Sequence, residues 1–203
     1  MAFDSEQLDD ILDHLWVHLE TATRSAKPPF HLPTLCNIDP AGRPDGRIVV
    51  LRRVERQTRR LMCHTDARSP KARAFRERPH ACWVFYDAPA KVQLRVTGTV
   101  TLRTDDAVAD AQWDASSPSS RRCYLAPSPP GELSETVSPN LPPGVRGRVP
   151  TAEESAAGRR NFAVVDCRVE RFDWLYLHHA GHRRARFVWA EGDATPTADW
   201  LEV

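Results

Sequence analysis

The hexapeptide Arg47-Ile48-Val49-Val50-Leu51-Arg52 is short, rich in β-branched residues and bounded by an arginine at each end. This composition predicts a β-strand in which Arg47 and Val49 lie on one face and Arg52 on the other. Before it stands a run of turn-forming residues, Asp39-Pro40-Ala41-Gly42-Arg43-Pro44-Asp45-Gly46, which predicts the tip of a hairpin. On this segment alone, an edge strand with solvated arginines is the simpler interpretation.

Segments with a period of two continue on both sides of the hexapeptide. We predict strands over residues 31–38, 47–54, 60–64, 81–86, 91–102, 162–177, 184–189 and 200–203. Helices are expected over 4–21, 69–78 and 105–113, and after the capping-box sequence that starts at Thr151. Many strands with a few helices predict an α+β, mainly β, barrel-type fold rather than a doubly wound sheet.

The length of 203 residues suits one domain, 1–203, with its N-terminal helix within residues 1–27. Residues 116–150 contain many prolines and predict a loop. A loop of this length inside a domain is usually functional or disordered. We favour the functional alternative and expect this loop to form a lid.

Charge and cysteine usage restrict the class of protein. Basic and acidic residues number 28 and 27, which argues against a nucleic-acid or membrane-surface binder. No stretch of eighteen apolar residues exists, so no membrane span is expected. The five cysteines are scattered, and the N-terminus is acidic and amphipathic without a secretory pattern. These features predict a cytoplasmic protein with reduced thiols.

A strand end that runs into a helix start forms a candidate anion site. It contains His64 and Thr65, then Ser69 as helix N-cap with Pro70 at the first helical position, and Lys71 in the first turn. The N–H groups of a helix N-terminus favour a bound anion. The plainer alternative is that Ser69 only caps the helix and that Lys71 is solvated.

Two further polar features lie on the later strands. Gln93 lies within a strand, and residues 172–187 resemble a hairpin with a basic tip that contains His182. No metal site is predicted, because His178 and His179 would face opposite sides of a strand and no cysteine or carboxylate stands at a ligand-like spacing.

In order and spacing, these segments resemble the pyridoxamine 5′-phosphate oxidase-like FMN-binding family over residues 30–203. The resemblance rests on the Arg47–Arg52 strand, the pair His64-Thr65, Ser69-x-Lys71-Ala72, Gln93-x-x-x-x-Gly98, the Trp174 strand and the terminal hairpin from His182 to Trp189. It implies a six-stranded antiparallel split β-barrel with flanking helices. It also implies a homodimer with FMN in a cleft at the subunit interface.

The resemblance also implies roles for individual residues. Arg47 and Lys71 would hold the FMN phosphate with help from Thr65 and Ser69, and Val49, Leu51 and their backbone would lie along the flavin ring. Gln93 would hydrogen-bond the polar edge of the ring, and Trp174 and Arg186 would reach it from the partner subunit. The complete expected cofactor set is Arg47, Ile48, Val49, Val50, Leu51, Arg52, His64, Thr65, Ser69, Lys71, Gln93, Trp174 and Arg186.

The residues expected at the substrate depart from the family pattern. Arg52 replaces a lysine, Arg121 or Arg122 would replace a loop arginine, and His182 and Arg184 occur in swapped order. We expect His182, Arg184 and Arg52 to orient the substrate, with His182 able to exchange a proton near neutral pH.

This combination predicts an FMN-dependent oxidoreductase that acts on a small anionic substrate. Three alternatives stay open. They are a genuine pyridoxamine/pyridoxine 5′-phosphate oxidase, a non-catalytic flavin-binding protein, and a barrel that has lost the cofactor.

Overall fold

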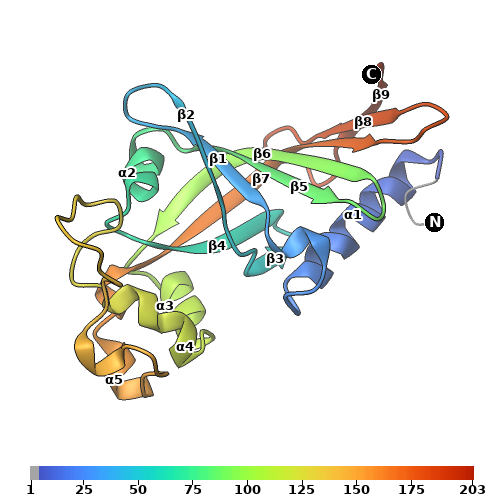
Figure 1. Ribbon diagram of the computed structural model, residues 1–203. Coiled ribbons are helices and arrows are strands. Elements are labelled where there is room, and N and C mark those ends of the chain that lie inside the picture. The colour runs from blue at the N-terminus through green and yellow to red at the C-terminus, as the bar shows by residue number, and fades with distance from the viewer. Residues whose placement is uncertain (1–4) are drawn as a thin grey trace.

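The computed structural model of the chain describes residues 5–203, and Figure 1 shows a long twisted sheet with helices at both ends. Within these residues the sheet has nine strands: β1 Thr34–Ile38, β2 Pro44–Ile48, β3 Arg53–Glu55, β4 Arg60–Asp66, β5 His80–Asp87, β6 Val92–Arg103, β7 Phe162–Tyr176, β8 Arg183–Val188 and β9 Thr197–Leu201. The α-helices are α1 Leu8–Ala22, α2 Pro70–Glu77, α3 Ala107–Asp114, α4 Pro118–Arg121 and α5 Ala152–Ala156. Short 3₁₀ turns are η1 Pro29–His31, η2 Arg122–Leu125, η3 Pro143–Val145 and η4 Arg159–Asn161.

Neighbouring strands pair antiparallel in the order β2-β1-β5-β6-β7-β4-β3, and the β8–β9 hairpin extends the sheet from β7. The predicted α+β, mainly antiparallel β class is therefore confirmed. The count differs from the six strands that we expected, and the pairing order is an open path rather than a ring. One reason is that the single strand expected over 47–54 is interrupted at residues 49–52, so that its two ends become β2 and β3.

Residues 49–52 nevertheless connect the two ends of this pairing order. The backbone N–H of Val49 donates to the carbonyl of Pro33 at 3.0 Å, and that of Leu51 to His31 at 3.0 Å. The N–H of Arg52 turns the other way and donates to the carbonyl of Met62 at 2.9 Å. The hexapeptide thus contacts β1 on one side and β4 on the other.

The main core lies between α1 and the inner face of the sheet. Helix α1 buries Ile11, Leu15 and Leu19, which recur every fourth residue. The ring of Trp16 packs 4.8 Å from that of Phe172 on β7. Helix α1 begins at Leu8, later than expected, and residue 4 of the expected helix lies outside the described residues.

A smaller core lies at the other end of the sheet, where α3 to α5 gather (Figure 1). The rings of Trp113, Tyr124 and Phe162 meet there edge to face, 5.0–5.9 Å apart. The expected loop over 116–150 is partly wrong, since α4, η2 and η3 lie within it. The capping box at Thr151 is confirmed, because its side chain and that of Glu154 satisfy each other's backbone N–H. Among the described residues, no helix has the length and apolar character that crossing a bilayer requires.

Candidate functional site

Arg47 lies on β2 and turns toward the inner face of the sheet. It pairs in register with Leu35, whose side chain is buried, so the two side chains share that face. Its Nη1 donates to the carbonyl of Leu35 at 3.0 Å and to the side chain of Asn37, and its Nη2 contacts the carboxylate of Asp45. The guanidinium is therefore held in place at the end of β2, rather than solvated as in the simpler interpretation.

The junction between β4 and α2 buries two hydroxyls. Thr65 and Ser69 are only 3% and 2% exposed, and their hydroxyl oxygens lie 3.1 Å apart. Ser69 also accepts a hydrogen bond from the N–H of Ala72 at 3.3 Å, and Pro70 occupies the first helical position. The predicted helix start with its Ser69 cap is confirmed.

Lys71 lies half-buried in the first turn of α2, where the charge of Arg47 acts on it. Burial lowers the pKa of Lys71, and the charge of Arg47 lowers it further, while Cys63, Asp66 and Asp45 act in the opposite direction. Among residues 5–203, no carboxylate forms an ion pair with Lys71. Two cations that lie within electrostatic range of each other, one of them unpaired, create a local positive potential that suits an anion.

The hydrophobic side chains of the hexapeptide do not all face the same way. Val49 and Leu51 are buried in the main core, whereas Ile48 is 61% exposed on the outer face and Val50 is half-buried. Of Val49 and Leu51, only the backbone is therefore available to a flavin ring that lies on the outer face. Strand alternation accounts for this division.

Arg52 and His64 line a polar hollow of about 320 Å³ with Gln112 and three serines. Its full lining is Thr23, Arg52, His64, Gln112, Ala115, Ser116, Ser117 and Ser120. His64 Nε2 lies 3.3 Å from Gln112 Oε1. Burial lowers the pKa of His64 to about 4, and the charge of Arg52 also lowers it, although Gln112 opposes the shift. At neutral pH this hollow contains one cation, an uncharged imidazole and several neutral polar groups.

Sequence reasoning missed Gln112 and the serines of this hollow. Gln112 lies in the predicted helix 105–113 and the serines lie in the predicted loop 116–150, where nothing distinguishes them from other polar residues. Their only signal in the sequence is the polar run Ser116-Ser117-Pro118-Ser119-Ser120, which is equally typical of a helix cap. Ser117 does cap α4, accepting from the N–H of Ser120.

The C-terminal hairpin carries the other group of expected site residues. Leu175 on β7 pairs with Gln93 on one side and with Arg184 on the other, so these residues share a face. Arg184 donates to both carboxylate oxygens of Asp173, at 3.1 and 2.8 Å, and this raises its pKa. Arg186 pairs with Asp199 at 3.0 Å. His182 is exposed in the segment before β8.

The predicted residues thus form two groups, at opposite ends of one chain. Arg47, Thr65, Ser69 and Lys71 lie near α2, and the hairpin β8–β9 lies at the far end of the sheet (Figure 1). A single chain does not bring the two groups together.

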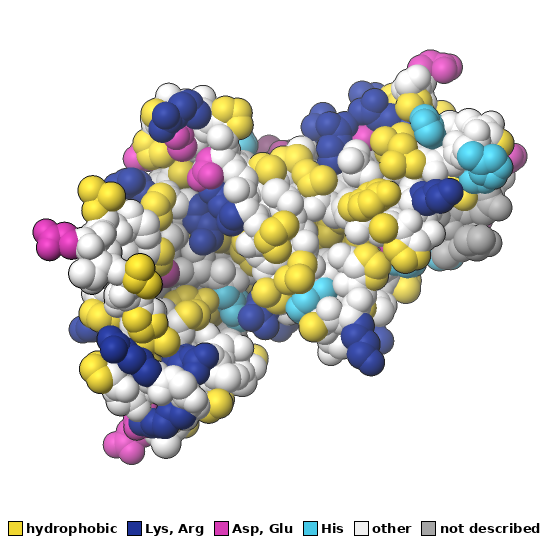
Figure 2. Space-filling view, viewed as in Figure 1, with side chains coloured by type: hydrophobic (Ala, Val, Ile, Leu, Met, Phe, Trp, Pro, Cys, Tyr) yellow, Lys and Arg dark blue, Asp and Glu magenta, His cyan; other side chains and the backbone are white. Residues whose placement is uncertain are grey.

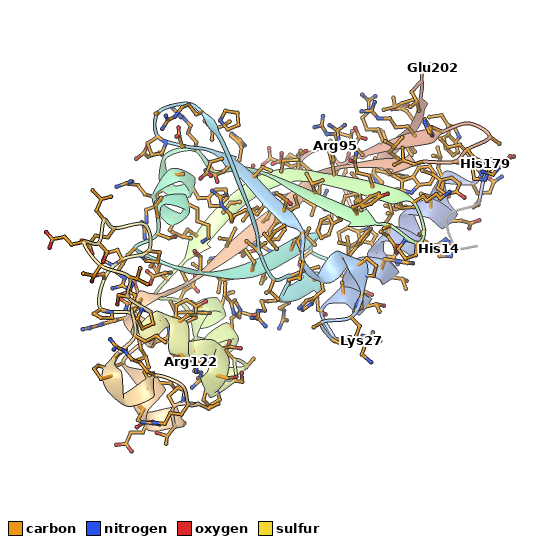
Figure 3. All side chains as sticks on the ribbon, in the orientation of Figure 1. His14, Lys27, Arg95, Arg122, His179 and Glu202 are labelled. Carbon is orange, nitrogen blue, oxygen red and sulfur yellow. The ribbon has the colours of Figure 1, made fainter. Side chains whose placement is uncertain are left out.

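Three of the expected residues make other contacts within the described chain. Trp174 is fully buried in the main core, because alternation along β7 turns it inward and turns Asp173 outward. Arg121 stacks 4.8 Å from the ring centroid of Trp113 and donates to the carbonyl of Trp113 at 2.8 Å, which caps α3. Arg122 donates to the carbonyl of Arg148, and Figure 3 shows it far from the hairpin that carries His179.

The expectation that His178 and His179 face opposite sides of a strand is wrong. Strand β7 ends at Tyr176, and the two imidazole rings lie 4.3 Å apart in the following turn. Within residues 5–203 no group of three potential metal ligands gathers around them or elsewhere.

Residues 13–104 match the family model described as pyridoxamine 5′-phosphate oxidase, FMN-binding domain. A pyridoxine/pyridoxamine 5′-phosphate oxidase of Azorhizobium caulinodans is 37% identical over 95 residues, which are 47% of this chain and 43% of that protein. The pyridoxine/pyridoxamine 5′-phosphate oxidase 2 of Arabidopsis thaliana is 32% identical over 104 residues, and the match covers 47% of this chain and 52% of that protein. The chain therefore matches about half the length of these curated relatives.

Two solved structures share the fold over nearly the whole chain. A pyridoxamine 5′-phosphate oxidase-related, FMN-binding protein from Nostoc punctiforme has a TM-score of 0.70 at 24% identity, covering 92% of this chain and 95% of its own. PhzG from Burkholderia lata, solved with tetrahydrophenazine-1-carboxylic acid, has a TM-score of 0.70 at 16% identity, covering 99% and 96%. Together with the sequence matches, they confirm the resemblance to the pyridoxamine 5′-phosphate oxidase-like family.

Proposed function

Because the chain matches the FMN-binding region and the fold of the pyridoxamine 5′-phosphate oxidase-like family, we propose that it binds FMN and acts as an FMN-dependent oxidoreductase on a small anionic substrate. The observation that carries this proposal is the position of the unpaired Lys71 within electrostatic range of Arg47, beside the buried hydroxyls of Thr65 and Ser69. All four residues lie within the matched segment 13–104.

The phosphate of FMN binds at the start of α2 in this proposal. A phosphate monoester carries close to two negative charges near neutral pH and has several strong acceptor oxygens. Lys71 and Arg47 supply the opposite charge, and Thr65 and Ser69 supply hydroxyl donors. Each hydrogen bond to a charged group contributes about 1.5–3 kcal/mol.

A homodimer would complete the site. Strand β8 lies at the other end of the sheet from α2 (Figure 1), so in this proposal a second copy supplies Gln93, His182, Arg184 and Arg186 to the FMN that Lys71 holds. The outer face of the sheet supports this proposal, since Ile48 on β2 and Tyr86 on β5 are 61% and 51% exposed there. Figure 2 shows hydrophobic side chains gathered over this face. An apolar surface of this kind is typical of a subunit contact.

The same proposal includes the six-stranded split barrel. In it, β2, residues 49–52 and β3 act as one bent strand that bonds to β1 at one end and to β4 at the other. The hydrogen bonds from Val49 to Pro33 and from Arg52 to Met62 support this closure. The β8–β9 hairpin is then an extension outside the barrel.

The hollow beside Arg52 is the proposed place for the substrate. Arg52 has no ion-pair partner within residues 5–203, so its charge is available to a carboxylate or phosphate. His64 is uncharged at neutral pH and offers a hydrogen bond instead of a second positive charge. Bound flavin supplies the hydride or electron transfer, and these residues orient the substrate. His182 of a second copy would exchange a proton.

The first experiment is an absorbance spectrum of the purified protein, followed by release of the cofactor on heating and its identification. Yellow protein that releases FMN supports the proposal. Protein that stays colourless after incubation with FMN contradicts it and indicates a fold that has lost the cofactor. Light scattering of the eluted peak tests the dimer separately.

Genuine pyridoxamine/pyridoxine 5′-phosphate oxidation is the second candidate, and the names of the two curated relatives favour it. Anaerobic mixing of the holoprotein with pyridoxine 5′-phosphate distinguishes the two. Bleaching of the flavin with formation of the aldehyde supports this activity. A flavin that no donor reduces, whether pyridoxine phosphate or nicotinamide nucleotide, indicates a non-catalytic flavin-binding protein instead.

A further inference from the structure

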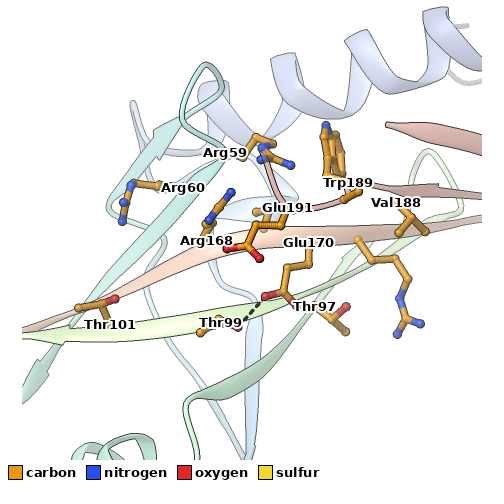
Figure 4. Close-up of a pocket in the computed structure, with 13 residues that line it drawn as sticks. Arg59, Arg60, Thr97, Thr99, Thr101, Arg168, Glu170, Val188, Trp189 and Glu191 are labelled. Atoms are coloured by element: carbon orange, nitrogen blue, oxygen red, sulfur yellow. Dashed lines mark hydrogen bonds between the residues drawn. The ribbon is translucent and has the colours of Figure 1, made fainter. Parts of the chain in front are cut away.

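A second, larger cleft lies along the middle of β6 and β7, away from the start of α2. It has a volume of about 810 Å³. Its walls are the turn before β4, the strands β6 and β7, and the segment after β8 (Figure 4). None of its lining residues belongs to the proposed FMN phosphate site or to the hollow beside Arg52.

Arginines dominate the charge of this cleft. Arg59, Arg60, Arg168 and Arg171 line it, against the carboxylates of Glu170 and Glu191. Arg60 on β4 pairs in register with Arg168 on β7, which places two like charges directly opposite each other. Like charges directly opposite each other are destabilising, and among residues 5–203 only Arg60 of this pair has a carboxylate partner.

The nearby carboxylates neutralise this group only in part, although Glu191 lines the cleft and the charge of Asp193 acts on Arg59. Asp166 binds Arg60 at 2.6 Å and Arg103 at 3.2 Å, so it is already shared between two arginines. Glu170 accepts a hydrogen bond from the hydroxyl of Thr99 at 2.6 Å. Neither Arg168 nor Arg171 forms an ion pair or side-chain hydrogen bond with any residue in the described range 5–203.

Arg59 is held over the cleft by its backbone and by an aromatic ring. Its φ of 55° lies in the left-handed region, which is uncommon for a residue with a side chain. Its guanidinium carbon lies 5.7 Å from the ring centroid of Trp189. Burial lowers the pKa of Arg59, and the charge of Arg168 lowers it further, while the charge of Asp193 acts in the opposite direction. The two guanidinium groups therefore repel each other across the cleft, and Figure 4 shows both side chains on the same side of the sheet.

Three threonines complete the lining with neutral donors. Thr97, Thr99 and Thr101 alternate along β6 and face the cleft. Arginine forks and hydroxyl groups together match the acceptor oxygens of phosphate better than those of an uncharged ligand.

We infer that this cleft binds a small phosphorylated molecule with two or more negative charges, independently of FMN. The ligand relieves the repulsion among Arg59, Arg60 and Arg168, and its phosphate oxygens accept from Arg168, Arg171 and the threonine hydroxyls. The volume of about 810 Å³ is within the usual range for sites that bind small organic molecules.

Calorimetric titration with inorganic pyrophosphate tests this inference on protein saturated with FMN. We expect binding to the unmodified protein, and affinity that is at least about tenfold weaker in the double variant Arg168→Gln/Arg171→Gln. Arg24→Gln, which removes an exposed arginine elsewhere, leaves the affinity unchanged. Lys71→Gln also leaves it unchanged, which separates this cleft from the FMN phosphate site.

Thermal unfolding provides a second readout. In buffer free of phosphate, Arg168→Gln is at least as stable as the unmodified protein, because the substitution removes a repulsive pair. Pyrophosphate raises the midpoint of the unmodified protein and not that of the double variant. Absence of pyrophosphate binding, equal affinity in the double variant, or loss of binding in Lys71→Gln would each overturn the inference. The inference would also be overturned if the unmodified protein binds no pyrophosphate and the double variant dissociates from a dimer, because the arginines would then belong to a subunit contact.

Discussion

Thr65 Oγ1 lies 3.1 Å from Ser69 Oγ, across the junction where β4 ends and α2 begins. Both side chains are almost fully buried, and Ser69 also caps the helix through the N–H of Ala72. The contact fixes the first turn of α2 against the sheet. Lys71 follows in that first turn, where the charge of Arg47 acts on it, and the proposed phosphate site depends on this placement.

Replacing Lys71 by glutamine should weaken FMN binding by about 1.5–3 kcal/mol, because a charge-assisted hydrogen bond to the phosphate is lost. Arg47→Ala should weaken it by a similar amount. Fluorescence titration of the apoprotein with FMN measures both. Arg73→Gln is the matched control, since Arg73 lies on the same helix and is exposed. Lys71→Gln with the FMN affinity of the unmodified protein would contradict the placement of the phosphate.

Ser69→Ala should lower the free energy of unfolding by about 1 kcal/mol through loss of the helix cap. It should also weaken FMN binding, because α2 is then less firmly positioned. Thr65→Val keeps the cap and should affect FMN binding more than stability. Urea unfolding of the apoprotein, compared with FMN titration, separates the two effects. If Thr65→Val destabilises the apoprotein yet binds FMN normally, the Thr65 hydroxyl does not contact the FMN phosphate.

The buried His64 should make stability depend on pH. Its pKa is about 4 in the folded chain, below its ordinary value of 6.5. Between these values the unfolded chain binds more protons, so the free energy of unfolding falls as the pH decreases through this window. The loss attributable to His64 between about pH 7 and about pH 5 is about 2 kcal/mol. Urea unfolding at both pH values should show a smaller loss in His64→Gln, and equal losses in the two proteins would refute the assignment.

Arg52→Gln should reduce kcat/KM for an anionic substrate by about tenfold or more and leave the FMN content unchanged, because Arg52 lines the substrate hollow. Arg53→Gln is the neighbouring control, since Arg53 is paired with Glu55 at 2.7 Å. Steady-state kinetics on the substrate identified for the holoprotein provide the measurement. If the two variants behave alike, the substrate does not contact Arg52.

Gly98→Ala should destabilise the fold by roughly 2–4 kcal/mol. A Cβ at Gly98 would lie 2.0 Å from the carbonyl oxygen of Arg168, at the irregularity where β6 and β7 change register. Gly144→Ala is the control, because a Cβ there meets nothing within 4 Å. Differential scanning calorimetry should show a lower midpoint for Gly98→Ala alone. An unchanged midpoint would mean that the bulge relaxes without cost.

Local sequence signals predicted most elements of the fold. The leucine spacing predicted α1, Ser69-Pro70 predicted the start of α2, and the capping box predicted α5. These signals act between residues a few positions apart, so they are present in the sequence itself. The split of the predicted strand 47–54 into β2 and β3 was not predictable in this way. It results from hydrogen bonds to Pro33 on one side and to Met62 on the other.

The sequence by itself determined the strand and helix pattern, the helix cap at Ser69 and the resemblance that suggests FMN. Only the tertiary structure decided that the charge of Arg47 acts on Lys71, that Gln112 joins His64 and Arg52 around one hollow, and that Trp174 points into the core. The physical reason is distance along the chain. These contacts join residues that are far apart in sequence, and their geometry depends on how strands pair and on which face each side chain takes after every bend and bulge.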